Sequence, residues 1–85
     1  MPNLEPDTLF ETAMAAHRRG DLDAARKAYE EVLQNDPKHA GAWMNLGVLH
    51  RAMGASEAAL AALRRAECLA PDHEGILYNL GNALM

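Results

Sequence analysis

The stretch Ala42–His50, "AWMNLGVLH", places an asparagine and a glycine inside an apolar segment that has the period of a helix. Glycine costs a helix about 1 kcal/mol relative to alanine, and a buried asparagine needs hydrogen-bond partners. A similar stretch, "GILYNLGNA", follows at Gly75–Ala83. The asparagine and the glycine both return there at the same offset along the chain, as Asn79 and Gly81, which indicates an internal repeat.

The breaks between the apolar segments recur at that same fixed distance along the chain. The recurring pairs are Gly20 and Gly54, Ala25 and Ala59, Pro37 and Pro71, and His39 and His73. Glycine permits a tight reversal of the chain, and proline denies the preceding helix its continuation. We therefore divide a single domain, 1–85, into a repeat at 6–39, a second at 40–73 and a partial third at 74–85.

The apolar period is helical throughout, and no segment alternates as a strand would. The breaks predict five helices, at about Asp7–Arg19, Leu22–Gln34, Ala40–Met53, Ser56–Leu69 and from Glu74 onward. Each helix pair can bury its apolar face only against its neighbours. The sequence therefore predicts an all-α fold of antiparallel helix pairs.

Length and charge favour a binding protein over an enzyme. A chain of 85 residues forms one domain with a modest core, too small for an elaborate catalytic cleft and its scaffold. Twelve acidic and eight basic residues give a net charge of −4, and Lys and Arg nowhere cluster as phosphate binding requires. We expect no nucleic-acid partner.

The cysteine count and the first residues bear on the compartment. Cys68 is the single cysteine, so it cannot form an internal disulfide. The start, "MPNLEPDTLF", lacks the basic and apolar regions of a signal peptide, and no apolar run approaches the about 18 residues that span a bilayer. We expect a cytoplasmic protein that does not enter a membrane, with Cys68 as a buried, unreactive thiol.

No active site or metal site assembles in the sequence. Ser56 is the only serine and lies in a turn, no carboxylate pair has an evident apolar pocket, and no glycine-rich phosphate loop follows a strand. The histidines His17, His39, His50 and His73 never occur at i, i+4 and lack ligand partners at metal spacing. We expect neither cofactor nor metal. Two of these histidines, His39 and His73, precede helix starts, where they either cap backbone amides or lie exposed.

The repeat resembles the tetratricopeptide repeat, whose 34-residue pattern is W-x-x-L-G-x-x-Y followed by alanine, an aromatic residue, alanine and proline. The second repeat matches at Trp43, Leu46, Gly47, Ala59, Ala66 and Pro71, with His50 and Leu63 in place of the usual Tyr and Phe. The other repeats match at Ala13, Ala25, Tyr29, Pro37, Leu77, Leu80 and Gly81. The resemblance covers nearly the whole chain and implies a right-handed helical solenoid. In it, Gly47 and Ala59 are small so that two helices approach closely.

One stripe of the first, third and fifth helices carries the candidate binding residues. At 100° per residue the stripe also includes Glu11, His17 and Met85. The resemblance implies that it lines a concave groove for extended peptides, in which Asn45 and Asn79 bind the ligand backbone because a carboxamide both donates and accepts. A plainer interpretation leaves both asparagines exposed to water. The candidate residues are Phe10, Met14, Met44, Asn45, Val48, Arg51, Tyr78, Asn79 and Asn82.

One variant of the family binds the C-terminal carboxylate of a peptide through lysine and arginine in the groove. Phe10 and Met14 stand where the first-repeat Lys and Asn of that variant would be, and Gly75 and Asn79 replace its third-repeat basic residues. That variant is therefore disfavoured. We expect an apolar, amide-rich groove that suits an extended segment with small or hydrophobic side chains.

Three functions stay open. The favoured one is a non-enzymatic module that binds a protein or peptide partner. The first alternative is an N-terminal substrate-docking segment of a longer enzyme such as a transferase, and the second is self-association. Leu77, Leu80 and Leu84 lie where the fifth helix would pack on a partner helix, so we expect them to form the contact of a homo-oligomer or of a longer array.

Overall fold

The computed structural model describes residues 6–84, with side chains from Thr8 onward. It contains the helices α1 (Pro6–Arg18), α2 (Leu22–Asn35), α3 (Ala40–Ala52), α4 (Ser56–Leu69) and α5 (Glu74–Leu84), and no strand between residues 6 and 84. Every predicted helix is present, with its bounds within one residue of those expected. The predicted all-α helical-repeat fold is confirmed. Met85, on the predicted stripe, lies outside the described residues.

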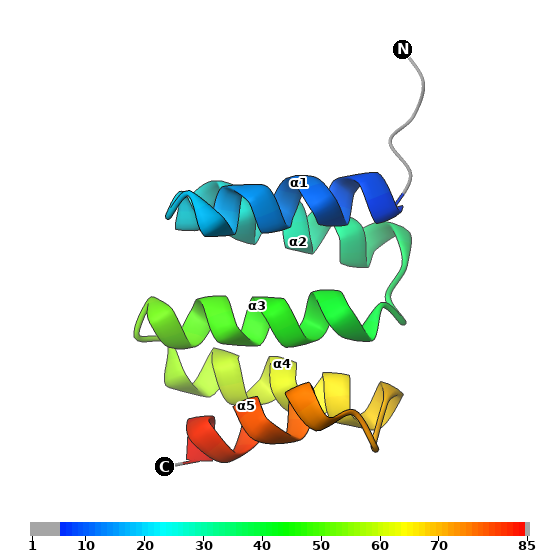
Figure 1. The fold of residues 1–85 in the computed structure, drawn as a ribbon, viewed down its shortest axis with the longest axis vertical. Coiled ribbons are helices and arrows are strands. Elements are labelled where there is room, and N and C mark those ends of the chain that lie inside the picture. Colours follow the sequence, from blue (N-terminus) through cyan, green and yellow to red (C-terminus); the bar gives the residue numbers. More distant parts are fainter. Residues whose placement is uncertain (1–5, 85) are drawn as a thin grey trace.

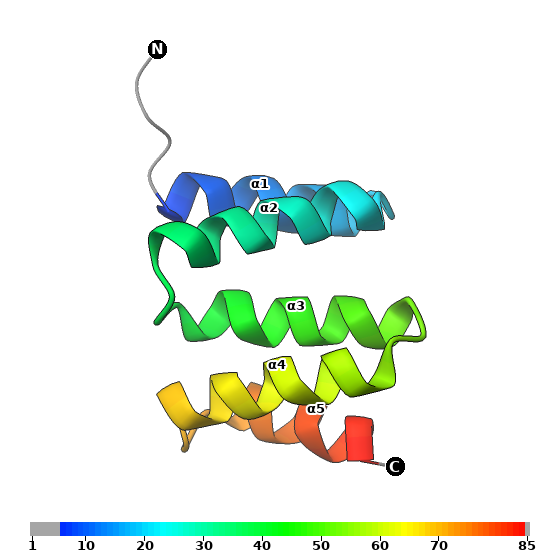
Figure 2. The same ribbon diagram turned by 180° about the vertical axis from the view of Figure 1, so that it is seen from behind.

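The helices form two layers. The main packing partners are α1 with α2 and α3 with α4, while α2 also contacts α3 and α5 contacts α4 and α3. Figures 1 and 2 show α1, α3 and α5 on one side of the molecule and α2 and α4 on the other, with consecutive helices antiparallel. We call the first side the α1–α3–α5 face. Because the same helix of each repeat lies on it, side chains at equivalent places in successive repeats share this surface.

Both turns inside the repeats use a left-handed glycine. Gly20 has φ of +83° and Gly54 has φ of +81°, a region that other L-residues rarely adopt. Each glycine lets the next backbone N–H return to a carbonyl five residues earlier, which satisfies the end of the preceding helix. These bonds are Asp21 N to Ala16 O at 3.0 Å and Ala55 N to His50 O at 2.8 Å.

Histidine side chains cap the two helices that begin the later repeats. The Nδ1 atom of His39 accepts a hydrogen bond from the Ala42 N–H at 3.0 Å, and Nδ1 of His73 accepts one from the Ile76 N–H at 3.2 Å. The first amides of a helix have no partner within the helix, so each cap satisfies one of them. Of the two roles expected for these histidines, the structure shows capping.

Gly47 is required where α3 meets α4. A Cβ atom at this position would lie 2.7 Å from Leu63 Cγ and 3.2 Å from the carbonyl oxygen of Ala59. The predicted close approach at Gly47 and Ala59 is therefore confirmed. Gly81, at the same place in the next repeat, has no atom within 4 Å of its Cβ position beyond its chain neighbours and its own helix backbone, because no described helix packs on that side of α5.

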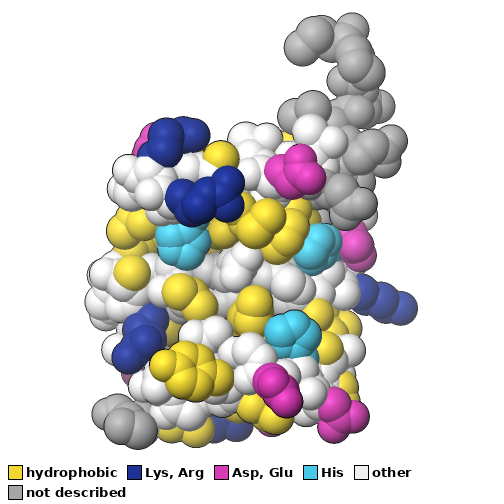
Figure 3. All heavy atoms as spheres, viewed as in Figure 1, with side chains coloured by type: hydrophobic (Ala, Val, Ile, Leu, Met, Phe, Trp, Pro, Cys, Tyr) yellow, Lys and Arg dark blue, Asp and Glu magenta, His cyan; other side chains and the backbone are white. Residues whose placement is uncertain are grey.

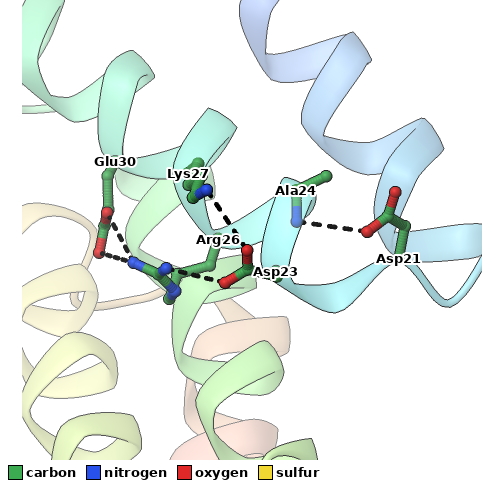
Figure 4. Close-up of polar contacts among 6 residues, drawn as sticks. All are labelled: Asp21, Asp23, Ala24, Arg26, Lys27 and Glu30. Atoms are coloured by element: carbon green, nitrogen blue, oxygen red, sulfur yellow. Dashed lines mark hydrogen bonds and ion pairs between the residues drawn. The ribbon is translucent and has the colours of Figure 1, made fainter.

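The outer surface of α2 carries the ion pairs of the described chain, drawn in Figure 4. Arg26 contacts Asp23 at 2.9 Å and Glu30 at 3.1 Å, and Lys27 contacts Asp23 at 3.4 Å. The hydrogen bond from Arg26, aided by the charge of Lys27, lowers the pKa of the Asp23 carboxyl. These groups are largely exposed, and exposed pairs stabilise a fold only slightly. This is the solvated outer face that the charge pattern predicts.

Two burial predictions were wrong. Cys68 is exposed, because it lies two residues, or about 200°, around the helix from buried Ala66 and so points away from α3. Leu80 is buried, because it follows Ile76 by one helical turn and shares its inward face. The other predicted oligomer contacts are open to solvent, with Leu77 44% exposed and Leu84 58% exposed.

Candidate functional site

The predicted binding residues lie on helices that form the α1–α3–α5 face. Figure 3 views this face and shows hydrophobic side chains across its middle, with Lys and Arg side chains toward the side where α1 and α3 end and also at the opposite edge. Arg51 and Tyr78 are exposed. The half-buried members are Phe10, Met14, Met44, Asn45, Val48, Asn79 and Asn82. Most of the predicted stripe is thus only partly covered by the fold itself.

A hollow of about 260 Å³ opens where α1, α2 and α3 meet. Its lining residues are Met14, His17, Arg18, Tyr29 and Asn45. The three from α1 share one side of that helix because they are spaced three and four residues apart. The hollow therefore unites two of the candidate binding residues, Met14 and Asn45, with three further side chains, His17, Arg18 and Tyr29.

The hydroxyl of Tyr29 supplies the polar floor of the hollow. The Tyr29 side chain is fully buried, and its Oη atom lies 3.2 Å from Nδ1 of His17, with the donor set by the histidine tautomer. Burial raises the pKa of this hydroxyl above its ordinary value of 10.0, while a hydrogen bond with Asn45 and the charge of Arg18 partly offset the rise. Asn45 and Arg18 thus both oppose the effect of burial on the pKa of this hydroxyl.

Met14 is the apolar residue that lines the hollow, and Phe10 lies one turn before it on α1. Both pack against the core. The Phe10 ring centroid lies 4.5 Å from that of His39 and 6.1 Å from that of Tyr29. Half-buried in this way, Phe10 offers a ligand one side of its ring, and its other contacts hold α1 to α2 and to the start of α3.

On α5 the predicted residues lie in a different setting. The Nδ2 atom of Asn79 donates to the carbonyl oxygen of Gly75, one turn back in its own helix, at 2.8 Å. This leaves the Asn79 side-chain oxygen as an acceptor and the second N–H as a donor for a ligand. Tyr78 is 72% exposed. The α5 residues therefore extend the face without contributing to the hollow.

Sequence reasoning did not assign Arg18 or Tyr29 to the site. Tyr29 matched the repeat pattern as a core residue, and its ring does fill the core, but its hydroxyl reaches the hollow. The repeat offered a signal for Tyr29, because the equivalent position in the second repeat is the apolar Leu63. A polar atom at an otherwise apolar position marks a place where a buried partner is required.

Between residues 6 and 84, no group of three or more His, Cys, Asp or Glu side chains is placed to hold a metal ion. No described helix combines the length and apolar character needed to cross a membrane. The side chains that line the hollow carry amide, hydroxyl, imidazole and guanidinium groups, beside the apolar side chain of Met14.

Comparison with known proteins gives the family. The model of the tetratricopeptide repeat family matches residues 10–74. A TPR repeat-containing protein of Synechococcus elongatus is 40% identical over 73 residues, which are 82% of this chain and 18% of that protein. The protein O-mannosyl-transferase TMTC1 of Mus musculus is 32% identical over 79 residues, which are 93% of this chain and 8% of that protein.

The chain spans less than a fifth of the length of each of these two relatives. The family match nevertheless covers all five helices at least in part, and it includes the whole of α2, α3 and α4. The sequence match and the helical architecture both indicate the same repeat, and the chain belongs to the tetratricopeptide repeat family.

Proposed function

We propose that the chain is a non-enzymatic protein–protein interaction module whose α1–α3–α5 face binds an extended peptide segment of a partner protein. The observation that carries this proposal is the hollow of about 260 Å³, where the Asn45 carboxamide stands beside the apolar Met14. Binding sites are usually concave and lined by apolar side chains with a few polar groups among them. Tetratricopeptide repeats generally mediate protein–protein interaction, which supports the same function.

In this proposal Asn45 binds the backbone of the ligand. A carboxamide donates to a peptide C=O and accepts from a peptide N–H, so it can fix the register of an extended chain whatever its sequence. Met44 and Val48 flank Asn45 on α3 and are half-buried, leaving part of each side chain for apolar contact. Amides then set the register, and apolar contacts select the sequence.

The α5 residues give the ligand a second, weaker contact. Asn79 has one side-chain hydrogen engaged with Gly75, so it keeps its oxygen and one N–H for a ligand. Tyr78 and Asn82 lie on the same helix and extend the surface, and Arg51 lies in the last turn of α3. Such a short face spans few ligand residues, and ordering a flexible peptide offsets much of the contact energy. We expect a dissociation constant of about 1 μM or weaker.

The test begins with a selection. Random ten-residue peptides displayed on phage are selected on the immobilised protein, and a synthetic copy of a selected peptide is titrated by calorimetry. Asn45→Ala should weaken binding by about 1–3 kcal/mol, because it removes the partner of a desolvated peptide group. Asn35→Ala is the matched control. Asn35 is exposed on α2 and bonds only the Glu31 carbonyl in the described structure, so its loss should leave affinity unchanged.

Selection of no peptide by the wild type would contradict the proposal. Equal affinity of wild type and Asn45→Ala would show instead that peptides bind elsewhere. Circular dichroism of both variants should match the wild type, because neither side chain is fully buried.

A second candidate is a docking segment within a longer enzyme. The likeness to an O-mannosyl-transferase supports it, although the chain spans only 8% of that protein. In that case the same face would bind the substrate of a catalytic domain elsewhere in the polypeptide. We place the module in the cytoplasm, and the exposed, unpaired Cys68 fits a reducing compartment.

Self-association is a further candidate, supported by the exposed leucines of α5. Leu77 and Leu84 lie on the side of α5 that corresponds to the α4-facing side of α3. A second copy could cover both leucines by packing its own α5 across them in a two-fold arrangement. Sedimentation equilibrium at increasing concentration tests this, since Leu77→Glu should leave a monomer if the contact is real.

A further inference from the structure

We propose that the hollow between α1, α2 and α3 is a subsite for one carboxylate side chain, Asp or Glu, within the bound peptide, and that Arg18 is its cationic partner. The inference rests on the proposed peptide-binding function and deepens it by naming the chemistry of one ligand residue. It differs from recognition of a peptide's terminal carboxylate, because it uses one arginine at the end of α1 and not a row of basic residues on successive repeats.

The hollow carries positive charge without a matching anion. Its lining includes the Arg18 guanidinium and contains no Asp or Glu. The ion pairs found among residues 8–84 all lie on the outer surface of α2, where Arg26 and Lys27 meet Asp23 and Glu30. Arg18 is exposed, so water solvates its charge while no ligand is bound. An anionic side chain that enters the hollow could therefore form an ion pair with Arg18. No described acidic side chain competes for that interaction.

The other polar groups of the hollow suit a carboxylate. The Asn45 side chain supplies N–H donors. The Tyr29 hydroxyl is fully buried against Nδ1 of His17, so the direct contacts to a ligand are left to Asn45 and Arg18. A carboxylate accepts through two oxygens, so Arg18 and one neutral donor can bind it together. Met14 then contacts the methylene carbons of the same side chain.

The size of the hollow fits a single side chain. Its volume of about 260 Å³ lies below the range of about 300–1,000 Å³ that is usual for small-molecule sites. Its opening onto the α1–α3–α5 face lets the peptide backbone stay on the surface, near Asn45, while one side chain points inward. A peptide in extended conformation directs alternate side chains toward such a surface.

A simpler explanation for Arg18 is its place in the last turn of α1, where a cation complements the helix dipole. That explanation does not distinguish Arg18 from Arg19, which follows the end of the same helix and is also exposed. Only Arg18 lines the hollow and acts on the Tyr29 hydroxyl. The neighbouring arginine is therefore a matched control for charge.

The experiment compares peptide selections on three proteins, the wild type, Arg18→Gln and Arg19→Gln, with a displayed library of random ten-residue peptides. Wild type and Arg19→Gln should both select peptides with Asp or Glu at one fixed position, and Arg18→Gln should lose that preference. A selected peptide and its Glu-to-Gln or Asp-to-Asn copy are then titrated by calorimetry. The wild type should bind the acidic peptide about fivefold more tightly, and Arg18→Gln should bind both peptides equally.

Each other outcome overturns the subsite in a recognisable way. Peptides that bind the wild type without an acidic position would remove the subsite and leave the peptide-binding function standing. An acidic preference that survives Arg18→Gln, or one that Arg19→Gln loses equally, would show that the hollow does not confer it. If the wild type selects no peptide at all, the proposed function fails and the subsite fails with it.

Discussion

Asn45 and Asn79 occupy the same place in consecutive repeats, yet the structure gives them different chemistry. Asn45 lines a hollow whose floor is the Tyr29 hydroxyl, whereas Asn79 turns its amide back to the Gly75 carbonyl at 2.8 Å. The preceding helix explains the difference, because α4 carries Leu63 where α2 carries Tyr29. The repeat thus fixes where a residue lies, and the neighbouring helix decides what that residue can do.

The largest expected effect contrasts the two glycines that follow these asparagines. Gly47→Ala should destabilise the fold by about 2–3 kcal/mol, because its Cβ would lie 2.7 Å from Leu63 Cγ and force the helices apart. Gly81→Ala should stabilise the fold by up to about 1 kcal/mol, because the position is open and alanine favours a helix. Urea unfolding of both variants measures the contrast, and equal changes would contradict it.

The second contrast concerns peptide binding by the asparagines themselves. Asn45→Ala should cost about 1–3 kcal/mol of binding free energy. Asn79→Ala should cost less than about 1 kcal/mol, because Asn79 lies outside the hollow, where water can replace a lost hydrogen bond. Calorimetric titration of one selected peptide into both variants gives the two values. Equal losses would show that the hollow confers no advantage on Asn45, and lost helicity would show that these side chains support the fold.

A smaller effect on stability is expected at the histidine caps, which both later repeats share. His39→Ala and His73→Ala each remove an imidazole that accepts a backbone N–H, so each should cost about 1 kcal/mol of stability. Asparagine also caps helices, and His39→Asn should therefore recover most of the loss. Thermal unfolding followed by circular dichroism gives both numbers. An alanine variant at either position with unchanged stability would mean that the hydrogen bond contributes nothing there.

The smallest expected effect is a loss of stability at alkaline pH, which arises from Tyr29 in the first repeat. Burial raises the pKa of the Tyr29 hydroxyl above 10.0, so the folded state keeps this proton at a pH where the unfolded chain loses it. Its contribution to stability is full below pH 10.0 and falls as the pH rises through the folded pKa.

Tyr29→Phe should reduce the loss of stability between about pH 9 and pH 11, measured from urea midpoints. The matched control is Tyr78→Phe, because Tyr78 is 72% exposed. The same alkaline slope in wild type and Tyr29→Phe would contradict the buried setting of the hydroxyl.

The fold could be predicted closely because its signals are local. Left-handed glycines at Gly20 and Gly54 end helices whatever surrounds them, and the prolines that follow α2 and α4 mark the next boundaries. Because each of these signals recurs in the second repeat, each helix boundary in one repeat supports the equivalent boundary in the other. The misplacement of Cys68 is different, because its position about 200° around α4 from Ala66 already indicates the outer side of the helix.

The site could be predicted only in part. Asn45 and Met14 follow from the helical wheel, since each needs only its own helix and the repeat to be placed on the face. Arg18 and Tyr29 require the meeting of α1, α2 and α3. The direction of the Tyr29 hydroxyl, and its distance of 3.2 Å from His17, depend on side-chain packing between helices, which no spacing in the sequence encodes.

The most direct test of the central claim is a nuclear magnetic resonance titration of the labelled protein with a selected peptide. Side-chain amide signals report each asparagine separately. We predict that the Asn45 amide and the Met14 methyl signals shift in proportion to the peptide bound, while the amide of Asn35, on exposed α2 surface, does not move. Shifts confined to Asn35 and its neighbours on α2, with Asn45 unchanged at saturation, would contradict binding on the α1–α3–α5 face.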